Sequence, residues 1–116
     1  MNPDELKTRT RRFAVRVFRL AESLPETPTA RVIRNQILRC GSSVGANYRA
    51  ACRAKSKPDF VSKLGTVEEE ADETIYWMEL LIDTGIVKPR RLAGLMDEAN
   101  QIPAIVIASI KTAKRR

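Results

Sequence analysis

The stretch from Ser56 to Gly85 constrains the fold of this chain more than any other. Its boundaries are marked by a Ser-Lys-Pro-Asp start and by Gly85, a residue type that readily adopts the left-handed conformation at a helix end. Alternating steps of four and three residues place one line of side chains between them: Phe60, Leu64, Val67, Ala71, Thr74, Met78 and Leu81. This spacing is typical of a helix packed against other helices, so we predict one long amphipathic helix here.

Three further stretches show the same periodicity, so the expected helices span residues 3–24, 28–54, 58–84 and 89–113. Their core lines are Leu6, Phe13, Val17, Leu20 and Leu24; Ala30, Ile33, Ile37, Cys40, Val44, Asn47 and Ala51; and Leu92, Leu95, Ala99, Ile102 and Val106. The connections are short, as between antiparallel neighbours. The predicted fold is all-α: a single domain of residues 1–116 forming an antiparallel, up-down-up-down four-helix bundle.

Three local features modify this expectation. Gly41 and Gly45 weaken the second helix but allow a neighbouring backbone to approach closely. Pro103 lacks the N–H that a helix interior requires, so we expect it to kink the last helix or split it near Gln101. The basic tail, residues 111–116, is expected to fray.

Composition excludes several kinds of chemistry. The chain contains no histidine, so Ser-His-Asp and Cys-His systems, Glu-x-x-His di-iron sites and imidazole zinc sites cannot be built. Cys40 and Cys52 would lie roughly 18 Å apart on one helix, too far to form a disulfide. We expect no catalytic residue, metal or cofactor. No membrane span or signal peptide is recognisable, so a cytoplasmic protein is expected.

Charge is distributed unevenly along the chain. Residues 58–87 carry a net charge of −7, whereas residues 1–24, 25–57 and 88–116 carry +3, +6 and +5. The acidic helix is therefore expected to lie against basic partners, within the subunit or across an interface. Apolar residues beside its core line, among them Tyr76 and Trp77, add surface that a lone bundle does not need. Together these features predict a symmetric homo-oligomer.

The middle of the chain resembles the 23S ribosomal RNA intervening-sequence proteins, which are bacterial four-helix bundles. The motifs lie within residues 30–87: Gln36-Ile37-Leu38-Arg39, the run from Ser42 to Arg49, Ser56, Asp59-Phe60, Lys63-Leu64, Glu69 to Thr74, Tyr76-Trp77 and Gly85. The resemblance implies a homopentamer with a central channel and no established catalysis. A related branch implies an accessory role with a reverse transcriptase and its RNA. Many members carry a glutamate shortly after the asparagine, where this chain has Ala50 and Ala51.

One group of polar residues is interpreted as structural, in the core or at an interface: Arg39, Ser43, Asn47, Glu69, Glu73 and Trp77. Asn47 should bond to Ser43, Glu73 or a backbone carbonyl, and a ligand-binding amide is the alternative. Glu69 and Glu73 should pair with Arg39 or Arg49, the alternatives being an oxygen-ligand metal site or an acid–base pair. Trp77 should pack in the core or an interface, since a nucleobase stacked there would meet acidic neighbours.

The functional candidates are basic. They are Arg9, Arg11, Arg12, Arg16, Arg19, Arg31, Arg34, Arg53, Lys55 and Lys57, with Lys7 and the tail residues as further members. A net charge of +7 favours polyanionic partners, so the leading hypothesis is an accessory factor that binds RNA or DNA backbone without sequence readout. The alternatives are a solvated basic face, a protein-interaction scaffold without a nucleic-acid role and, more remotely, a carboxylate metal-binding protein.

Overall fold

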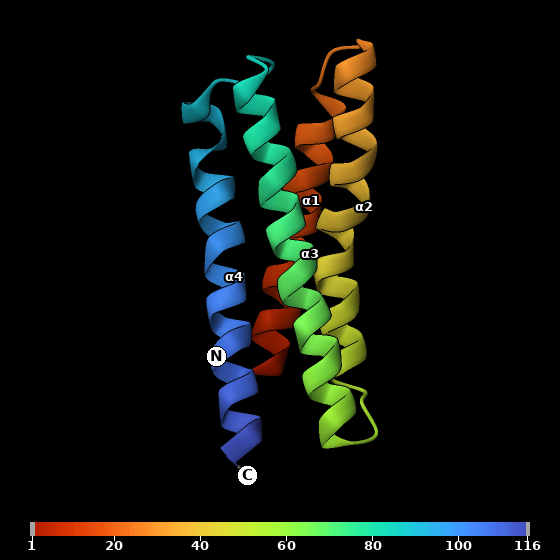
Figure 1. Cartoon of the computed structure of the whole chain (residues 1–116), viewed down its shortest axis with the longest axis vertical. Coiled ribbons are helices and arrows are strands. Elements are labelled where there is room, and N and C mark those ends of the chain that lie inside the picture. Colours follow the sequence, from red (N-terminus) through yellow and green to blue (C-terminus); the bar gives the residue numbers. More distant parts are fainter. Residues whose placement is uncertain (1, 116) are drawn as a thin grey trace.

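The computed structural model describes residues 2–115 and contains four α-helices and no strand in that range. They are α1 (Pro3–Glu22), α2 (Pro28–Ala51), α3 (Lys57–Asp83) and α4 (Pro89–Arg115), and they form an elongated bundle of 48 × 22 × 20 Å (Figure 1). The predicted fold class, an all-α antiparallel bundle, is confirmed. Within residues 2–115, no helix has the length and apolar character needed to cross a membrane.

Each helix packs against its neighbour in sequence, and α1 meets α4 to close the bundle. The α2–α3 interface is the most extensive and the α1–α4 interface the least. Helices α1 and α3 therefore occupy one diagonal of the bundle, and α2 and α4 the other (Figure 1). Consequently the acidic helix α3 has two direct neighbours, α2 and α4, and has no close backbone contact with α1 among the described residues.

The helix boundaries follow from local chemistry. Side chains of Asn2, Thr27 and Ser56 accept hydrogen bonds from the backbone N–H three residues later, at 2.9, 3.2 and 3.2 Å. A proline follows each cap within two residues, where its missing N–H costs nothing. Helix α3 ends as predicted, with Gly85 at a φ of +75°. The left-handed turn at Gly85 lets the Val87 N–H reach the Leu81 carbonyl at 3.1 Å.

The core consists of the predicted lines of side chains, which face one another along the bundle axis. Nearly all of them are buried; Phe60 and Asn47 are only half-buried. Helix α1 adds Thr10 to the core: this polar residue occupies the four-three position between Leu6 and Phe13 and is 1% exposed. Its hydroxyl donates to the Leu6 carbonyl at 2.9 Å, so a polar group enters the core already satisfied.

The two glycines of α2 face α1. A Cβ on Gly41 would lie 2.7 Å from Cγ1 of Val17, and one on Gly45 would lie 3.0 Å from Oγ1 of Thr10. Real Cβ atoms do not approach heavy atoms as closely as the first of these distances. The predicted close approach is therefore confirmed, and its partner is α1.

Helix α4 differs from two expectations. It runs without interruption from Pro89 to Arg115, so of the two outcomes expected at Pro103, a kink or a split, the split is wrong. Ile102 and Val106 on either side of the proline are fully buried, and their packing holds the flanking turns in one helix. The basic tail is helical through Arg115 instead of frayed, while Arg116 lies outside the described residues. Helices α1 and α2 end two and three residues earlier than expected.

Candidate nucleic-acid interface

The outward side of α1 carries an unbroken group of cations. Arg12, Arg16 and Arg19 recur in steps of four and three, so they lie on one face of the helix, and Arg11 adjoins them. All four are exposed, and no ion pair among residues 2–115 engages any of them. We call Arg11, Arg12, Arg16 and Arg19 the α1 arginine face. Because α1 lies diagonally opposite α3, this face is far from the acidic helix.

Two apolar side chains lie within or beside this face. Val15 is 47% exposed and Phe18 is 40% exposed. A shallow groove of about 490 Å³ runs along α1 here, lined by Thr8, Val15 and the four arginines. The arrangement can bind an anionic polymer through the guanidinium groups while its apolar parts pack on the valine.

Arg9 does not belong to this face. Its Nε and Nη2 donate to the two carboxylate oxygens of Glu98 on α4, both at 2.7 Å, and Nη2 also donates to the Gln101 side chain at 2.5 Å. Donation by Arg9 lowers the pKa of Glu98, and the same bond raises the pKa of Arg9. Arg9 therefore joins α1 to α4 and is not available to a phosphate. Sequence reasoning missed this pair, because only the bundle brings residues so far apart in the chain together.

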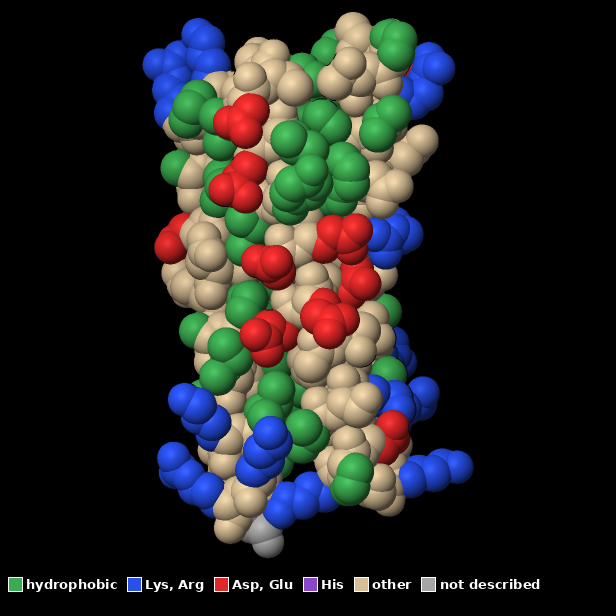
Figure 2. Space-filling model, viewed as in Figure 1, with side chains coloured by type: hydrophobic (Ala, Val, Ile, Leu, Met, Phe, Trp, Pro, Cys, Tyr) green, Lys and Arg blue, Asp and Glu red, His purple; other side chains and the backbone are tan. Residues whose placement is uncertain are grey.

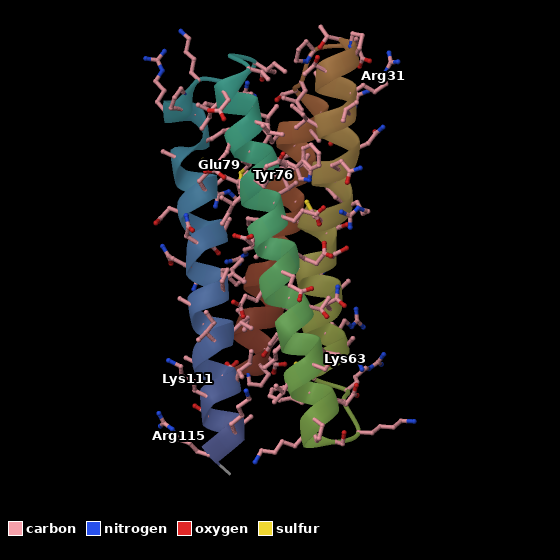
Figure 3. The ribbon with its side chains drawn as sticks, viewed as in Figure 1. Arg31, Lys63, Tyr76, Glu79, Lys111 and Arg115 are labelled. Carbon is pink, nitrogen blue, oxygen red and sulfur yellow. The ribbon has the colours of Figure 1, made fainter. Side chains whose placement is uncertain are left out.

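The remaining candidate cations do not form one cluster. Arg31 and Arg34 lie on the first turns of α2, whereas Arg53, Lys55 and Lys57 lie beyond its other end. The intervening helix separates these two sets by about 33 Å. Arg34 is also paired with Glu26 at 3.0 Å, which lowers the pKa of Glu26. Figure 3 shows Arg31 at one end of the bundle and Lys63, Lys111 and Arg115 at the other.

The end of the bundle that carries Arg53, Lys55 and Lys57 holds more cations than the sequence analysis had grouped together. We define the open end as residues 3–7, 49–63 and 109–115, where α1 and α3 begin and α2 and α4 end. It holds three carboxylates, Asp4, Glu5 and Asp59, and nine cations: Lys7, Arg49, Arg53, Lys55, Lys57, Lys63, Lys111, Lys114 and Arg115. Figure 2 shows lysine and arginine side chains at both ends, with carboxylates across the middle of the α3 side.

The polar residues interpreted as structural lie mostly between α2 and α3. Nη2 of Arg39 donates to Glu73 at 2.6 Å, and Nη1 lies 3.5 Å from Glu70. Burial, followed by the charge of Glu73, raises the pKa of Glu70. The Asn47 amide donates to the Ser43 backbone carbonyl at 2.8 Å, which was one of the expected partners.

Glu69 and Trp77 differ from the other residues interpreted as structural. Glu69 is exposed and belongs to no ion pair in the described part of the chain. Trp77 packs against the core and meets Tyr76 edge to face, with ring centroids 5.2 Å apart. Its indole N–H is buried without an acceptor. Tyr76 is 53% exposed and points outward from α3, as Figure 3 shows.

The candidate metal ligands and the two cysteines are not gathered into one site among residues 2–115. Among residues 2–115, no three Cys, Asp or Glu side chains are grouped so as to hold a metal ion. Cys40 is fully buried, which raises the pKa of its thiol, and Cys52 is a free, half-buried thiol at the end of α2. Glu73, the better placed of the two candidate metal carboxylates, is occupied by Arg39.

These observations define a class: an up-and-down four-helix bundle with basic ends, one basic side and one acidic side. Comparison with protein families narrows it, because the chain matches the 23S rRNA-intervening sequence protein family over residues 5–108. The chain belongs to this family, which confirms the resemblance noted in its middle helices. Neither the family description nor that of the related structure below names an enzymatic activity.

A solved structure supports the same assignment. A protein of unknown function from the S23 ribosomal protein family of Bacteroides thetaiotaomicron is 37% identical, with a TM-score of 0.89. The match covers 96% of this chain and 99% of that chain. Comparison with curated proteins returned no match.

Proposed function

We propose that this chain is a non-enzymatic, homo-oligomeric bundle that binds the backbone of RNA or DNA as an accessory factor. The observation that carries the proposal is the α1 arginine face: four exposed guanidinium groups on one side of one helix, none of them paired within residues 2–115. Guanidinium groups bind phosphate oxygens through charge-assisted, often bidentate hydrogen bonds. The family's association with 23S rRNA insertions is consistent with an RNA partner.

Binding of this kind is electrostatic and independent of sequence. Each phosphate contact releases condensed counterions, so affinity falls linearly with salt on a logarithmic plot, with a slope of about −0.7 per contact for single strands. The full chain is titrated with a mixed-sequence single-stranded oligonucleotide at several salt concentrations, with fluorescence anisotropy as the readout. Strong binding at low salt with a steep negative slope is expected.

A variant that lacks two of the arginines tests whether the α1 arginine face contacts the nucleic acid. Arg12→Gln combined with Arg19→Gln should reduce the slope by about 1.4 and weaken binding roughly 25-fold near 0.1 M salt. The matched control, Lys88→Gln with Arg90→Gln, removes the same charge from the start of α4, outside the α1 arginine face. Equal losses in the two variants would point to net charge alone. Absence of binding at low salt, or affinity indifferent to salt, would overturn the proposal.

The proposed assembly is a homo-oligomer, with five subunits as the family resemblance implies. Large apolar side chains remain exposed on separate helices, including Val32 at 58% and Tyr76 at 53%. Assembly would cover them and would place the carboxylates of α3 near the cations of another copy. Light scattering is expected to give a mass near five times the 13.1 kDa of one chain, and a mass of one chain at working concentration contradicts the assembly.

A protein-interaction scaffold is the second candidate, favoured by Val15 and Phe18 exposed among the arginines. The partner of such a scaffold is a protein, for example a nucleic-acid enzyme such as a reverse transcriptase. Capture of that purified partner should survive nuclease treatment and should be lost in Phe18→Ser. Capture that disappears with nuclease identifies nucleic acid as the bridge and favours the first candidate.

A further inference from the structure

Unequal helix lengths leave a groove at the open end. Helix α1 has 20 residues, whereas α3 and α4 have 27 each. At about 1.5 Å per residue the difference is roughly 10 Å. Figure 1 shows the first turn of α1 stopping short of the ends of α3 and α4. A groove of about 660 Å³ lies there, between the start of α1, the end of α2, the start of α3 and the last turns of α4.

The walls of this groove combine an apolar surface with two cations. Phe60 is half-buried and exposes part of its ring, Tyr48 lies deeper at 7% exposure, and Ala51 and Ala54 add small apolar surface. Lys7 on α1 and Lys57 on α3 approach the groove from two helices. Figure 2 shows hydrophobic side chains between lysines and arginines at this end of the molecule.

The carboxylates of the open end do not cancel this charge. Asp59 is bonded to Lys63, and Glu5 accepts a hydrogen bond from the Asn2 side chain at 2.7 Å within the cap of α1. Asp4 lies on the first turn of α1. Three carboxylates face nine cations here, so the potential favours an anionic ligand.

We propose that this groove receives one unpaired nucleotide of a single-stranded nucleic acid, the base packing on the ring of Phe60 and the phosphate lying between Lys7 and Lys57. The inference rests on the proposed function and adds to it a preference for unpaired bases. Base–aromatic stacking contributes about 1–3 kcal/mol per base and is insensitive to sequence, because every base has a π-face. Bases in a duplex are already stacked on their neighbours, so they are not available to Phe60. The surrounding lysines and arginines would bind the adjacent phosphates.

The test compares an oligonucleotide with an abasic strand of equal length, which carries the same phosphates and no bases. The full chain should bind the normal strand about 5- to 150-fold more tightly, the range that stacking of one base supplies. Phe60→Leu keeps an apolar side chain against the core but removes the ring. It should abolish this discrimination while the abasic strand binds as before with the same salt slope. Phe18→Leu, which removes an exposed ring from α1, is the control and should retain the discrimination.

Cys52 gives an independent readout, because its half-buried thiol lines the groove while Cys40 is fully buried. The normal strand should slow alkylation of Cys52, and the abasic strand should not. If both strands bind with equal, salt-dependent affinity, the groove proposal is overturned and the backbone-binding function stands. If neither strand binds at low salt, the groove proposal and the backbone-binding function both fail. Unchanged discrimination in Phe60→Leu, or equal protection of Cys52 by both strands, also overturns the groove.

Discussion

Helices α1 and α3 lie diagonally across the bundle and differ in charge and in how they are held. Helix α3 shares broad interfaces with α2 and α4, whereas α1 has its smaller contact with α4. Helix α1 gains its position from a close approach to Gly41 and Gly45 and from the pair between Arg9 and Glu98. Its outward arginines are exposed and form no ion pair among residues 2–115.

Helix α3 shows the opposite arrangement. Of its carboxylates, Glu70 and Glu73 meet Arg39 of α2 and Asp59 meets Lys63 of α3 itself. No ion pair among residues 2–115 engages the other five, which are Glu68, Glu69, Asp72, Glu79 and Asp83. Basic partners within the subunit thus account for few of these charges, and partners across an interface remain part of the proposed assembly. The two helices have similar periodicity, so their different roles come from where the bundle places them.

The largest expected effect tests how α1 is held. Gly41→Leu places a Cβ 2.7 Å from Cγ1 of Val17, a β-branched side chain that cannot rotate away. We expect a loss of about 2–3 kcal/mol in the free energy of unfolding, measured by urea denaturation at fixed protein concentration. Adding Val17→Ala to Gly41→Ala should restore part of the loss seen in Gly41→Ala alone, because the two sites are in contact. Additive effects would contradict the close approach.

The second prediction concerns the pair between α1 and α4. In Arg9→Met the Glu98 carboxylate, whose side chain is 18% exposed, loses both of its bonds to Arg9. The expected cost is about 1.5–2 kcal/mol, the range for hydrogen bonds to charged groups after allowance for partial exposure. Arg39→Met at the α2–α3 interface is the control, and it should cost less because Arg39 is more exposed, at 51%. A larger loss at Arg39 would reverse the comparison.

A substitution on α3 is expected to increase the stability of the protein. Gly65 has nothing within 4 Å of the position that a Cβ would occupy, in contrast to Gly41. Gly65→Ala should therefore stabilise the protein by about 0.5–1 kcal/mol through helix propensity and a less flexible unfolded chain. Thermal and urea unfolding measure the change. A destabilised variant would show that this part of α3 is covered in solution, as an oligomer would cover it.

The smallest expected effects separate two glutamates by their response to pH. The bond from Arg9 places the pKa of Glu98 below its usual 4.5, so its stabilising contribution is present above that pH and is lost as the pH falls through the folded-state pKa. Burial places the pKa of Glu70 above 4.5, so its contribution is present below that pH and is lost as the pH rises through the folded-state pKa.

Two glutamine variants test this difference. Glu98→Gln should flatten the acid side of the stability profile. Glu70→Gln should raise stability at neutral pH by about 0.5 kcal/mol, since it removes a charge that burial disfavours. Urea denaturation across the acid range measures both profiles. If the two variants changed the pH dependence of stability in the same way, the causes assigned to the pKa shifts of Glu98 and Glu70 would be contradicted.

The sequence determined the features that depend on neighbouring residues. The caps at Asn2, Thr27 and Ser56 and the stop at Gly85 follow from hydrogen-bonding groups within three or four residues of each helix end. The core lines follow from helical periodicity, which is why nearly all of their members are buried. Family membership was recognisable for the same reason, since its motifs are runs of neighbouring residues.

Only the tertiary structure decided which distant groups meet. It took Arg9 out of the candidate site by placing Glu98 beside it, and it separated Arg31 from Lys57 by the length of a helix. It also held α4 together across Pro103 and brought Lys7, Tyr48 and Phe60 to one groove. These outcomes depend on helix lengths and on which helix lies beside which. Periodicity specifies the buried face of each helix, whereas the mutual packing of all four helices selects its neighbours.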